Sequence, residues 1–334
     1  MSYKKRVALL YGGRGLEHSV SVEGAKNIIS LINRERYEII PTYISKNGDL
    51  SLRAPSSKDA GRCVHPIFKD GRGAFLAADG EIIPIDCAFP LLHGDFGEDG
   101  TIQGLLASLG IPFVGCDARA SAICLDKAVT KSVAEALDIP TVEWRLVTDG
   151  KTDKLNGILP AFVKPDCLGS SYGAGVAKTQ DDLVRAFADA DLLGSGRVLV
   201  EKFKSPIREL ELAYFSAQGE KIFSSAGEIL CNGFYSYDKK YIDNTKTVAV
   251  ADIPQSANER MREYSEALCS FIGIRHLARI DFFLSGDEIF LNEINTMPGM
   301  TETSLYLKLL SSVGISPAEA INRLISDVIE VSRT

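Results

Sequence analysis

Oxygen-bearing side chains recur within two apolar segments of the last quarter of the sequence. Arg279 and Asp281 lie in one apolar run, and Glu293 and Asn295 lie in the next. Both runs are predicted to be strands, and the alternation of side chains along a strand puts each pair on one face. If the strands form a hairpin, Asp281, Glu293 and Asn295 come together and offer the hard oxygen ligands that Mg²⁺ prefers. The alternative is a solvated strand face, although polar groups within apolar flanks are costly to bury without a metal or partner.

A glycine-rich loop, residues 169–175, follows a predicted strand that ends in Lys164. Glycines let backbone amides approach a phosphate closely, and a lysine at the strand end supplies fixed positive charge. The loop is not a P-loop, because the sequence has no GxxxxGK[ST], and the glycines at 12–15 do not complete a GxGxxG. Phosphate binding is therefore indicated, with a flexible turn as the alternative.

Lysines fall at the edges of four predicted elements, at Lys127, Lys164, Lys202 and Lys240. Most lysines are solvated surface charges, which is the alternative for each of these. Lys164 is the best candidate for a function, because it stands between the apolar pair 162–163 and Pro165. Strand 198–203 could read adenine through backbone hydrogen bonds at its edge, with Phe203 packed on the base; an ordinary strand exit is the alternative.

The elements that must position these residues alternate between strands and helices in the first third of the chain. The predicted strands are 7–11, 37–44, 86–92 and 111–115, and the predicted helices run from a cap at Ser19 or Ser21 to about Ile32 and over 101–109. Residues 47–80, rich in Gly, Ser, Asp and Lys, are interpreted as a variable surface excursion. This alternation predicts an open, mostly parallel sheet over residues 1 to about 118.

The rest of the chain mixes both kinds of element without an internal repeat or a low-complexity linker. The predicted helices are 121–137, 181–190, about 255–272 and 316–331, and the predicted strands are 161–164, 197–203, 210–215, 278–284 and 288–294. A chain of 334 residues can hold two or three domains of this kind.

Composition excludes several classes of function. A net charge of −7 without a block of like charges argues against duplex nucleic acid as a partner, because phosphate backbones need a basic face. The apolar run 7–11 is too short for a secretory signal or a membrane span, so a cytoplasmic protein without a membrane partner is expected. The seven cysteines form no CxxC pair and are expected to be free thiols, and the four histidines do not cluster with them into a zinc site.

Six motifs occur in order along the chain. They are Gly12-Gly13 with Glu17-His18-Ser19-Val20-Ser21, His93-Gly94 with Gly97-Glu98-Asp99-Gly100, Asp126-Lys127, Val163-Lys164-Pro165 with Gly169-Ser170-Ser171, Phe234-Tyr235 with Lys239-Lys240-Tyr241, and Asn292-Glu293-Ile294-Asn295-Thr296 with Pro298-Gly299. Any one could arise by chance, but the ordered set is specific and covers essentially the whole chain. In this order the motifs resemble those of the ATP-grasp superfamily, and within it the D-alanine–D-alanine ligases.

The resemblance implies a mixed α/β, three-domain ATP-grasp fold. Its parts would be a Rossmann-like domain over 1–118, a central domain over 119–203 and a C-terminal domain over 204–334. The implied reaction joins two D-alanines through a D-alanyl phosphate, releases ADP and phosphate, and serves peptidoglycan precursor synthesis. ATP and two Mg²⁺ ions, with Mn²⁺ as a substitute, are the implied cofactors, and a homodimer is compatible with the family.

Roles for individual residues also follow from the resemblance. Nucleotide binding would fall to residues that neutralise phosphate, frame adenine or hold the ribose: Lys127, Lys164, Ser171, Glu201, Lys202, Phe203, Glu209, Phe234 and Lys240. Asp281, Glu293 and Asn295 would hold the metals. Some family positions differ here, namely Ser19, Tyr172 and Met297, and Tyr172 puts the shape of the phosphate loop in question.

Substrate binding would use a second group of residues. Glu17 would bind the ammonium of the first D-alanine, and the resemblance assigns Arg279, Ser304, the Gly299 backbone, His93 and Leu305 to the oxyanion and the substrates. Glu17, Ser170 and Tyr241 would form a hydrogen-bonded trio across the closed site, with 165–175 and 231–243 as lids.

Two other functions compete with this interpretation. One is a different ATP-grasp ligase, such as a D-alanine–D-serine or D-alanine–D-lactate ligase, and the other is an inactive nucleotide-binding module. The neutral phenol of Tyr241, where lactate-forming members tend to have histidine, favours an amine as second substrate. Leu305 offers an apolar wall where serine-forming members tend to have arginine, and Tyr235 stands where they tend to have phenylalanine. These positions favour D-alanine in both subsites.

Overall fold

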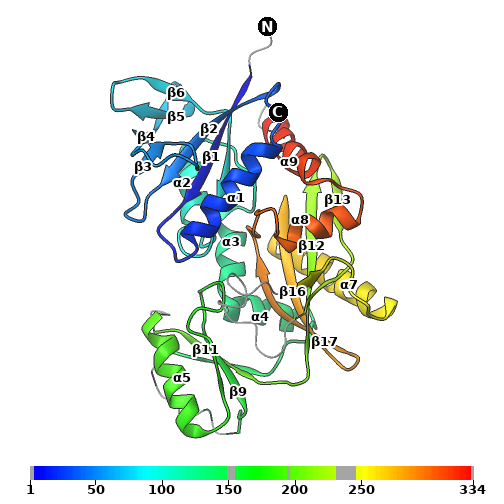
Figure 1. The fold of residues 1–334 in the computed structure, drawn as a ribbon. Coiled ribbons are helices and arrows are strands. Elements are labelled where there is room, and N and C mark those ends of the chain that lie inside the picture. The colour runs from blue at the N-terminus through cyan, green and yellow to red at the C-terminus, as the bar shows by residue number, and fades with distance from the viewer. Residues whose placement is uncertain are drawn as a thin grey trace.

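The computed structural model describes residues 4–148, 150, 155, 157–193, 196–230 and 246–331. Within these residues the chain builds three sheets, which lie at the upper left, the bottom and the right of Figure 1. Their strand orders are β6-β5-β4-β3-β2-β1-β7, β10-β9-β11-β8 and β15-β14-β12-β16-β17, with β13 paired to β12.

Strands and helices are distributed over the whole described chain. The strands are β1 Lys5–Gly12, β2 Tyr37–Ile44, β3 Leu50–Leu52, β4 Arg62–Lys69, β5 Arg72–Ala77, β6 Ile82–Pro84, β7 Cys87–Leu91, β8 Trp144–Val147, β9 Ala161–Pro165, β10 Gly175–Ala177, β11 Val198–Lys202, β12 Arg208–Ala217, β13 Glu220–Phe223, β14 Gly227–Leu230, β15 Lys246–Val248, β16 Leu277–Ser285 and β17 Glu288–Asn295. The helices are α1 His18–Leu31, α2 Thr101–Ser108, α3 Ala118–Leu125, α4 Lys127–Ala136, α5 Gln180–Leu193, α7 Gln255–Ile272, α8 Leu305–Ser312 and α9 Pro317–Val331.

The N-terminal sheet is mixed, so the prediction of a mostly parallel sheet is wrong. β1 pairs in parallel with β2 and β7, as the alternation of elements indicated. The other pairings, from β2 to β6, are antiparallel. Residues 47–80, interpreted as an excursion, supply β3, β4 and β5. The Gly, Ser, Asp and Lys residues that suggested a loop lie mainly in the turns between these strands.

Three element boundaries also differ from prediction. Residues 111–115 contribute a single bridge from Phe113 to Ala88 instead of a strand, and Pro112 has no N–H to extend the pairing. Helix 121–137 is two helices, because Asp126 caps α4 by accepting a hydrogen bond from Val129 N. α1 begins at His18 without a side-chain cap, and the Ser21 hydroxyl instead donates to Leu91 O and accepts from Gly12 N.

One apolar core joins the N-terminal and C-terminal parts. Alternate residues of β1 face opposite sides, so that Val7 and Leu9 enter this core while Ala8 and Leu10 enter the core on the other face. The shared core also takes in residues of β12, α8 and α9. α9 lies beside α1 in Figure 1, and Asn322 donates to Leu31 O and accepts from Asn33 N. This packing fixes α1, whose first turn follows Glu17.

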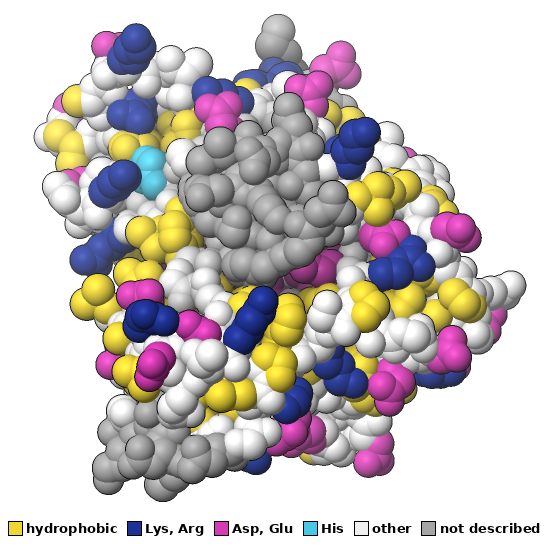
Figure 2. All heavy atoms as spheres, turned by 60° about the horizontal axis from the view of Figure 1, so that its bottom comes forward, with side chains coloured by type: hydrophobic (Ala, Val, Ile, Leu, Met, Phe, Trp, Pro, Cys, Tyr) yellow, Lys and Arg dark blue, Asp and Glu magenta, His cyan; other side chains and the backbone are white. Residues whose placement is uncertain are grey.

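Charge and thiols are arranged as in an ordinary globular protein over the part of the chain that the structure describes. Lys and Arg side chains are interspersed with Asp and Glu side chains on the face seen in Figure 2. Six cysteines are free thiols, as predicted, with Cys63 exposed and Cys167 partly exposed; Cys231 lies outside the described residues. No helix among the described residues is long and apolar enough to cross a membrane.

Candidate active site

Two adjoining cavities lie where the three sheets face one another. The larger, about 1180 Å³, runs between α1, the segment 293–308 and β14, and the smaller, about 370 Å³, lies between β9, β11 and the C-terminal sheet. Both fall near or within the range of about 300–1,000 Å³ that is usual for small-molecule sites. Lys127, Ser170, Glu211, Arg279 and Glu293 line both cavities, so these residues mark the junction.

The smaller cavity gathers the residues expected to bind nucleotide that the structure describes. They are Lys127, Lys164, Ser171, Glu201, Lys202, Phe203 and Glu209. The prediction that this strand has an edge free to bond adenine is wrong, because β11 lies between β9 and β8 in its sheet. Lys202 N and Phe203 N donate to Glu143 O and Pro160 O. The N–H groups there are thus taken by neighbouring backbone.

Lys164 and Glu201 form a buried ion pair in this cavity wall. Glu201 Oε2 lies 3.0 Å from Lys164 Nζ, and Glu201 Oε1 lies 2.8 Å from the fully buried Lys131 Nζ. Burial alone would raise the pKa of the Glu201 carboxyl, but the two ammonium groups lower it to about 2. Lys164 Nζ also donates to Asn292 Oδ1 at 3.2 Å. The carboxylate of Glu201 therefore orients Lys164, and the expected contact of Glu201 with adenine stays a prediction.

Three carboxylates stand in register across the C-terminal sheet. Glu211 on β12 pairs with Asp281 on β16, which pairs with Glu293 on β17. Asn295 Nδ2 donates to Asp281 Oδ2 at 3.1 Å, so the hairpin predicted to unite Asp281, Glu293 and Asn295 is confirmed. Like charges directly opposite one another on neighbouring strands are destabilising without a cation. This carboxylate row, Glu211, Asp281 and Glu293, is therefore a strong candidate for binding cations.

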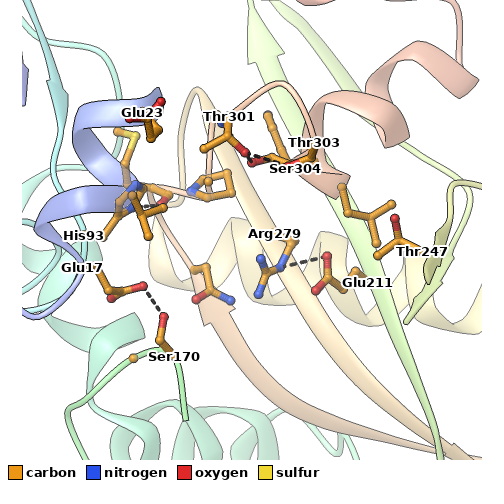
Figure 3. A pocket seen from close by; sticks show the side chains of 18 of the residues that line it. Glu17, Glu23, His93, Ser170, Glu211, Thr247, Arg279, Thr301, Thr303 and Ser304 are labelled. Carbon is orange, nitrogen blue, oxygen red and sulfur yellow. Dashed lines mark hydrogen bonds and ion pairs between the residues drawn. The ribbon is translucent and has the colours of Figure 1, made fainter. Parts of the chain in front are cut away.

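Arg279 and Lys127 are the cations that contact this row. Arg279 Nε and Nη2 donate to the two oxygens of Asp281 at 2.7 and 2.6 Å, and Nε lies 3.2 Å from Glu211 Oε2. Burial would lower the pKa of the Arg279 guanidinium, but Asp281 and Glu211 raise it well above its usual value. Lys127 Nζ lies 3.5 Å from Glu293 Oε2. Figure 3 shows Arg279 and Glu211 on the side of the cavity opposite Glu17.

Glu17 and Ser170 are in direct contact in the wall of the larger cavity. The Ser170 hydroxyl donates to Glu17 Oε1, as Figure 3 shows, so the predicted contact between these two members of the trio is present. Ser170 and Ser171 have φ of +53° and +57°, conformations uncommon for residues other than glycine. The third member, Tyr241, lies outside the described residues, as do Phe234, Tyr235 and Lys240.

The remaining residues expected to bind substrate line the larger cavity. They are His93, Gly299, Ser304 and Leu305. His93 Nδ1 donates to Met297 O at 2.9 Å, and its buried Nε2 has no hydrogen-bond partner among the described residues. A Cβ at Gly299 would approach Ser304 Oγ to 3.0 Å, so a larger residue would crowd that hydroxyl. Glu98, buried beneath this wall, accepts from Met297 N and Gly94 N and joins the two segments.

Glu211 and Lys131 are site residues that the sequence reasoning missed. Glu211 is two residues after Glu209 in an apolar strand, so alternation puts both on the face already expected to bind ribose. Lys131 is four residues after Lys127 on α4, a spacing that places both on one helix face. The spacing of Glu211 from Glu209 and of Lys131 from Lys127 could therefore have indicated these two residues, once Glu209 and Lys127 were assigned to the site.

Comparison with known proteins gives a consistent result over the whole chain. Residues 6–116 match the family model described as D-ala D-ala ligase N-terminus, and residues 133–326 match that described as D-ala D-ala ligase C-terminus. The D-alanine–D-alanine ligase of Caldicellulosiruptor bescii is 36% identical over 99% of this chain and 96% of its own.

Solved structures agree with the sequence matches. D-alanyl-alanine synthetase A of Vibrio cholerae is 30% identical, with a TM-score of 0.88 over 99% of this chain and 100% of that one. The D-alanine–D-alanine ligase of Bacillus anthracis, solved in complex with ATP, is 26% identical, with a TM-score of 0.75 over 99% of both chains.

Proposed function

The chain belongs to the D-alanine–D-alanine ligase family, and we propose that its two cavities together ligate two D-alanine molecules at the expense of ATP. A carboxylate oxygen of the first D-alanine takes the terminal phosphoryl group, and ADP leaves. The amine of the second D-alanine then attacks the acyl carbon of the D-alanyl phosphate. The C–O bond to phosphate breaks, an amide forms and the amine loses its proton. The product, D-alanyl-D-alanine, is a peptidoglycan precursor.

The carboxylate row and Asn295 are the residues that we propose hold Mg²⁺. Three carboxylates in register, offset by Arg279 and Lys127, form an oxygen-rich and negatively charged patch of the kind that binds hard divalent cations. Bound there, Mg²⁺ would offset negative charge on the transferred phosphoryl group. Mn²⁺, which also favours carboxylate ligands, is the proposed substitute.

The smaller cavity is the proposed ATP site. In support, Lys164 and Lys127 bring positive charge to its end nearest the carboxylate row, while Phe162, Phe203 and Phe283 supply apolar wall for a base. Glu201 holds Lys164 in place, and Glu209 is proposed to accept hydrogen bonds from the ribose. The ATP complex of the Bacillus anthracis relative makes ATP the natural nucleotide to test.

D-Alanine is proposed to lie in the larger cavity, between Glu17 and Arg279. Glu17 would accept hydrogen bonds from the first substrate's ammonium group, and Ser170 fixes the carboxylate that does so. Arg279, with the Gly299 backbone and the Ser304 hydroxyl, would stabilise the oxyanion and the second carboxylate. His93 Nε2, which has no partner within the described part of the chain, is a further acceptor for substrate, because the ring proton is on Nδ1.

The remaining expectations of the resemblance are kept as proposals. The limits 1–118, 119–203 and 204–334 are proposed as domains because each contains one of the three sheets. A cytosolic location is proposed because the reaction needs ATP and the chain carries free thiols. A homodimer is also proposed, and sedimentation of the purified protein would test this oligomeric state.

The proposed reaction predicts one dominant product. With ATP, Mg²⁺ and equal D-alanine, D-serine and D-lactate near neutral pH, we expect ADP and mainly D-alanyl-D-alanine, identified by mass. Leu305 is buried in the wall of the larger cavity, and its apolar side chain favours a methyl group. Omitting the substrates or chelating Mg²⁺ should abolish ADP release. ADP release without metal or without a D-amino acid would refute the proposed ligase activity. A predominance of D-alanyl-D-serine or of the D-alanyl-D-lactate depsipeptide would refute the proposed preference for D-alanine as second substrate.

Lys164 should be required for ATP use. Replacing it with alanine is expected to raise the KM for ATP or lower turnover by at least about tenfold, or about 1.4 kcal/mol. The reason is the loss of a buried ammonium group that Glu201 and Asn292 hold at the cavity. Lys178→Ala, at an exposed position of the same domain, is the matched control. An unchanged ATP dependence in a folded Lys164→Ala protein would make Lys164 a structural residue.

A further inference from the structure

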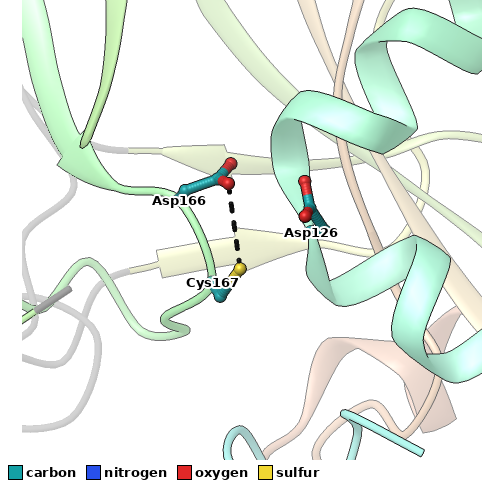
Figure 4. Close-up of side chains that lie close together, drawn as sticks. All are labelled: Asp126, Asp166 and Cys167. Carbon is teal, nitrogen blue, oxygen red and sulfur yellow. Dashed lines mark hydrogen bonds between the residues drawn. The ribbon is translucent and has the colours of Figure 1, made fainter. Parts of the chain in front are cut away.

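Asp126, Asp166 and Cys167 lie together beside the glycine-rich loop, as Figure 4 shows. Their potential ligand atoms lie within 4.8 Å of one another. The carboxylates are already paired, however. Arg197 Nε and Nη2 donate to Asp166 Oδ2 at 2.9 and 2.5 Å, and Nη2 also donates to Asp126 Oδ2 at 2.8 Å. The cluster is therefore an ion-pair network, and we call Asp126, Asp166 and Arg197 the Arg197 clamp.

Each carboxylate of the Arg197 clamp divides its oxygens between the arginine and the start of α4. Asp166 Oδ1 accepts from Ala128 N at 2.9 Å, and Asp126 Oδ1 accepts from Val129 N at 2.8 Å. Asp166 is fully buried, so its charge needs these partners. The clamp thus joins three segments: the end of α3, the loop after β9 and the residue that precedes β11.

Lys127 lies within the segment that the clamp holds. It is the first residue of α4, its backbone N donates to Asp166 O at 3.3 Å, and its Nζ donates to Leu168 O at 2.7 Å. Leu168 is two residues before Ser170, which bonds to Glu17. The start of the loop and the lysine are therefore fixed relative to each other through one network.

The glycine-rich loop needs such an anchor. Ser170 and Ser171 adopt positive φ, which persists where the surrounding structure over-determines it. Glycines at 169, 173 and 175 add conformational freedom to the same segment. Without a fixed start, this loop would sample other conformations, and the ammonium of Lys127 would lose its acceptor at Leu168.

We propose that Arg197 is a positioning residue for ATP, because it clamps Asp126 and Asp166 so that Lys127 and the loop 168–171 hold their phosphate-facing geometry. This proposal rests on the proposed function, in which Lys127 contacts phosphate. Arg197 itself lies outside the residues that line the two cavities and acts through Lys127.

The test is a double-mutant cycle on the full chain. Binding of Mg²⁺ with a non-hydrolysable ATP analogue is measured by calorimetry for wild type, Arg197→Met, Lys127→Met and the double variant, well below their unfolding midpoints. We expect Arg197→Met to weaken binding about tenfold in the wild-type background and less than about twofold in the Lys127→Met background. Arg197→Lys should recover part of the affinity. Arg185→Met, which breaks an exposed Arg–Asp pair on α5 in the same domain, should change it less than about twofold.

The outcomes separate this inference from the proposed function. A wild-type protein that does not bind the analogue refutes the proposed function. Normal binding by wild type and Arg197→Met alike, even with a lowered unfolding midpoint, makes the clamp merely structural and overturns the inference. Fully additive effects in the cycle, or a Lys127→Met variant that binds normally, overturn it as well, because Arg197 would then not act through Lys127.

Discussion

Replacing Glu293 with glutamine is expected to lower the kcat of ADP formation by at least about a hundredfold, or about 2.7 kcal/mol. The amide keeps the size of the side chain but removes one charge from the carboxylate row, where Glu293 pairs with Asp281 across the β16–β17 hairpin. Two acids and an asparagine attract a divalent cation less strongly than three acids and an asparagine. The steady-state rate at saturating Mg²⁺ and D-alanine measures this loss.

The stability of the same variant distinguishes a metal ligand from a structural residue. Without metal, the unfolding midpoint should change little, because the lost contact with Lys127 is offset by weaker repulsion within the row. The rise in midpoint that Mg²⁺ and an ATP analogue give the wild type should shrink. Glu288→Gln, at an exposed position of the same strand, should keep both the rate and this rise. A Glu293→Gln enzyme within about threefold of the wild-type rate would remove Glu293 from the proposed metal site.

The parts of the fold that sequence predicts best are those with strong periodic signals. β7 and the residues of β1 from Val7 onward are buried apolar runs, and α9 carries a clear apolar stripe, so all three were recognisable. The strands between 50 and 77 were not, because β3 has only three residues, β4 lacks a clear alternation of buried and exposed positions, and turn residues separate the strands. Their antiparallel pairing changes the N-terminal sheet from parallel to mixed, and composition alone does not predict such pairing.

For the candidate site, sequence predicted residue types better than contacts. The hairpin that unites Asp281, Glu293 and Asn295 follows from strand alternation. The carboxylate of Glu201 is different, since its position between Lys131 and Lys164 depends on how α4 packs against β11 and β9. Contacts between distant segments arise from packing, which alternation within one strand does not encode.

Replacing Arg279 is expected to cause the largest combined loss of activity and stability, because its guanidinium group neutralises the carboxylate row and is also proposed to stabilise the oxyanion. Arg279→Met is expected to lower kcat/KM by about 10²–10³-fold, the usual effect of removing one oxyanion donor. It should also destabilise the protein by about 3–5 kcal/mol, since Asp281 and the buried Glu211 lose their guanidinium partner. Steady-state kinetics and denaturant unfolding measure the two effects.

The response of this variant to metal and to a conservative substitution tests why Arg279 matters. If repulsion within the carboxylate row causes the instability, millimolar Mg²⁺ should restore more stability to Arg279→Met than it adds to wild type, because the ion supplies the missing positive charge. Arg279→Lys keeps the charge but not the planar fork that bonds both oxygens of Asp281, so it should recover stability more fully than activity. Arg208→Met removes a similar but partly exposed fork to Glu228 in the same sheet, and should cost less stability and little activity. A lysine variant with the wild-type kcat/KM would mean that charge alone suffices and that the directed hydrogen bonds of Arg279 are not part of the reaction.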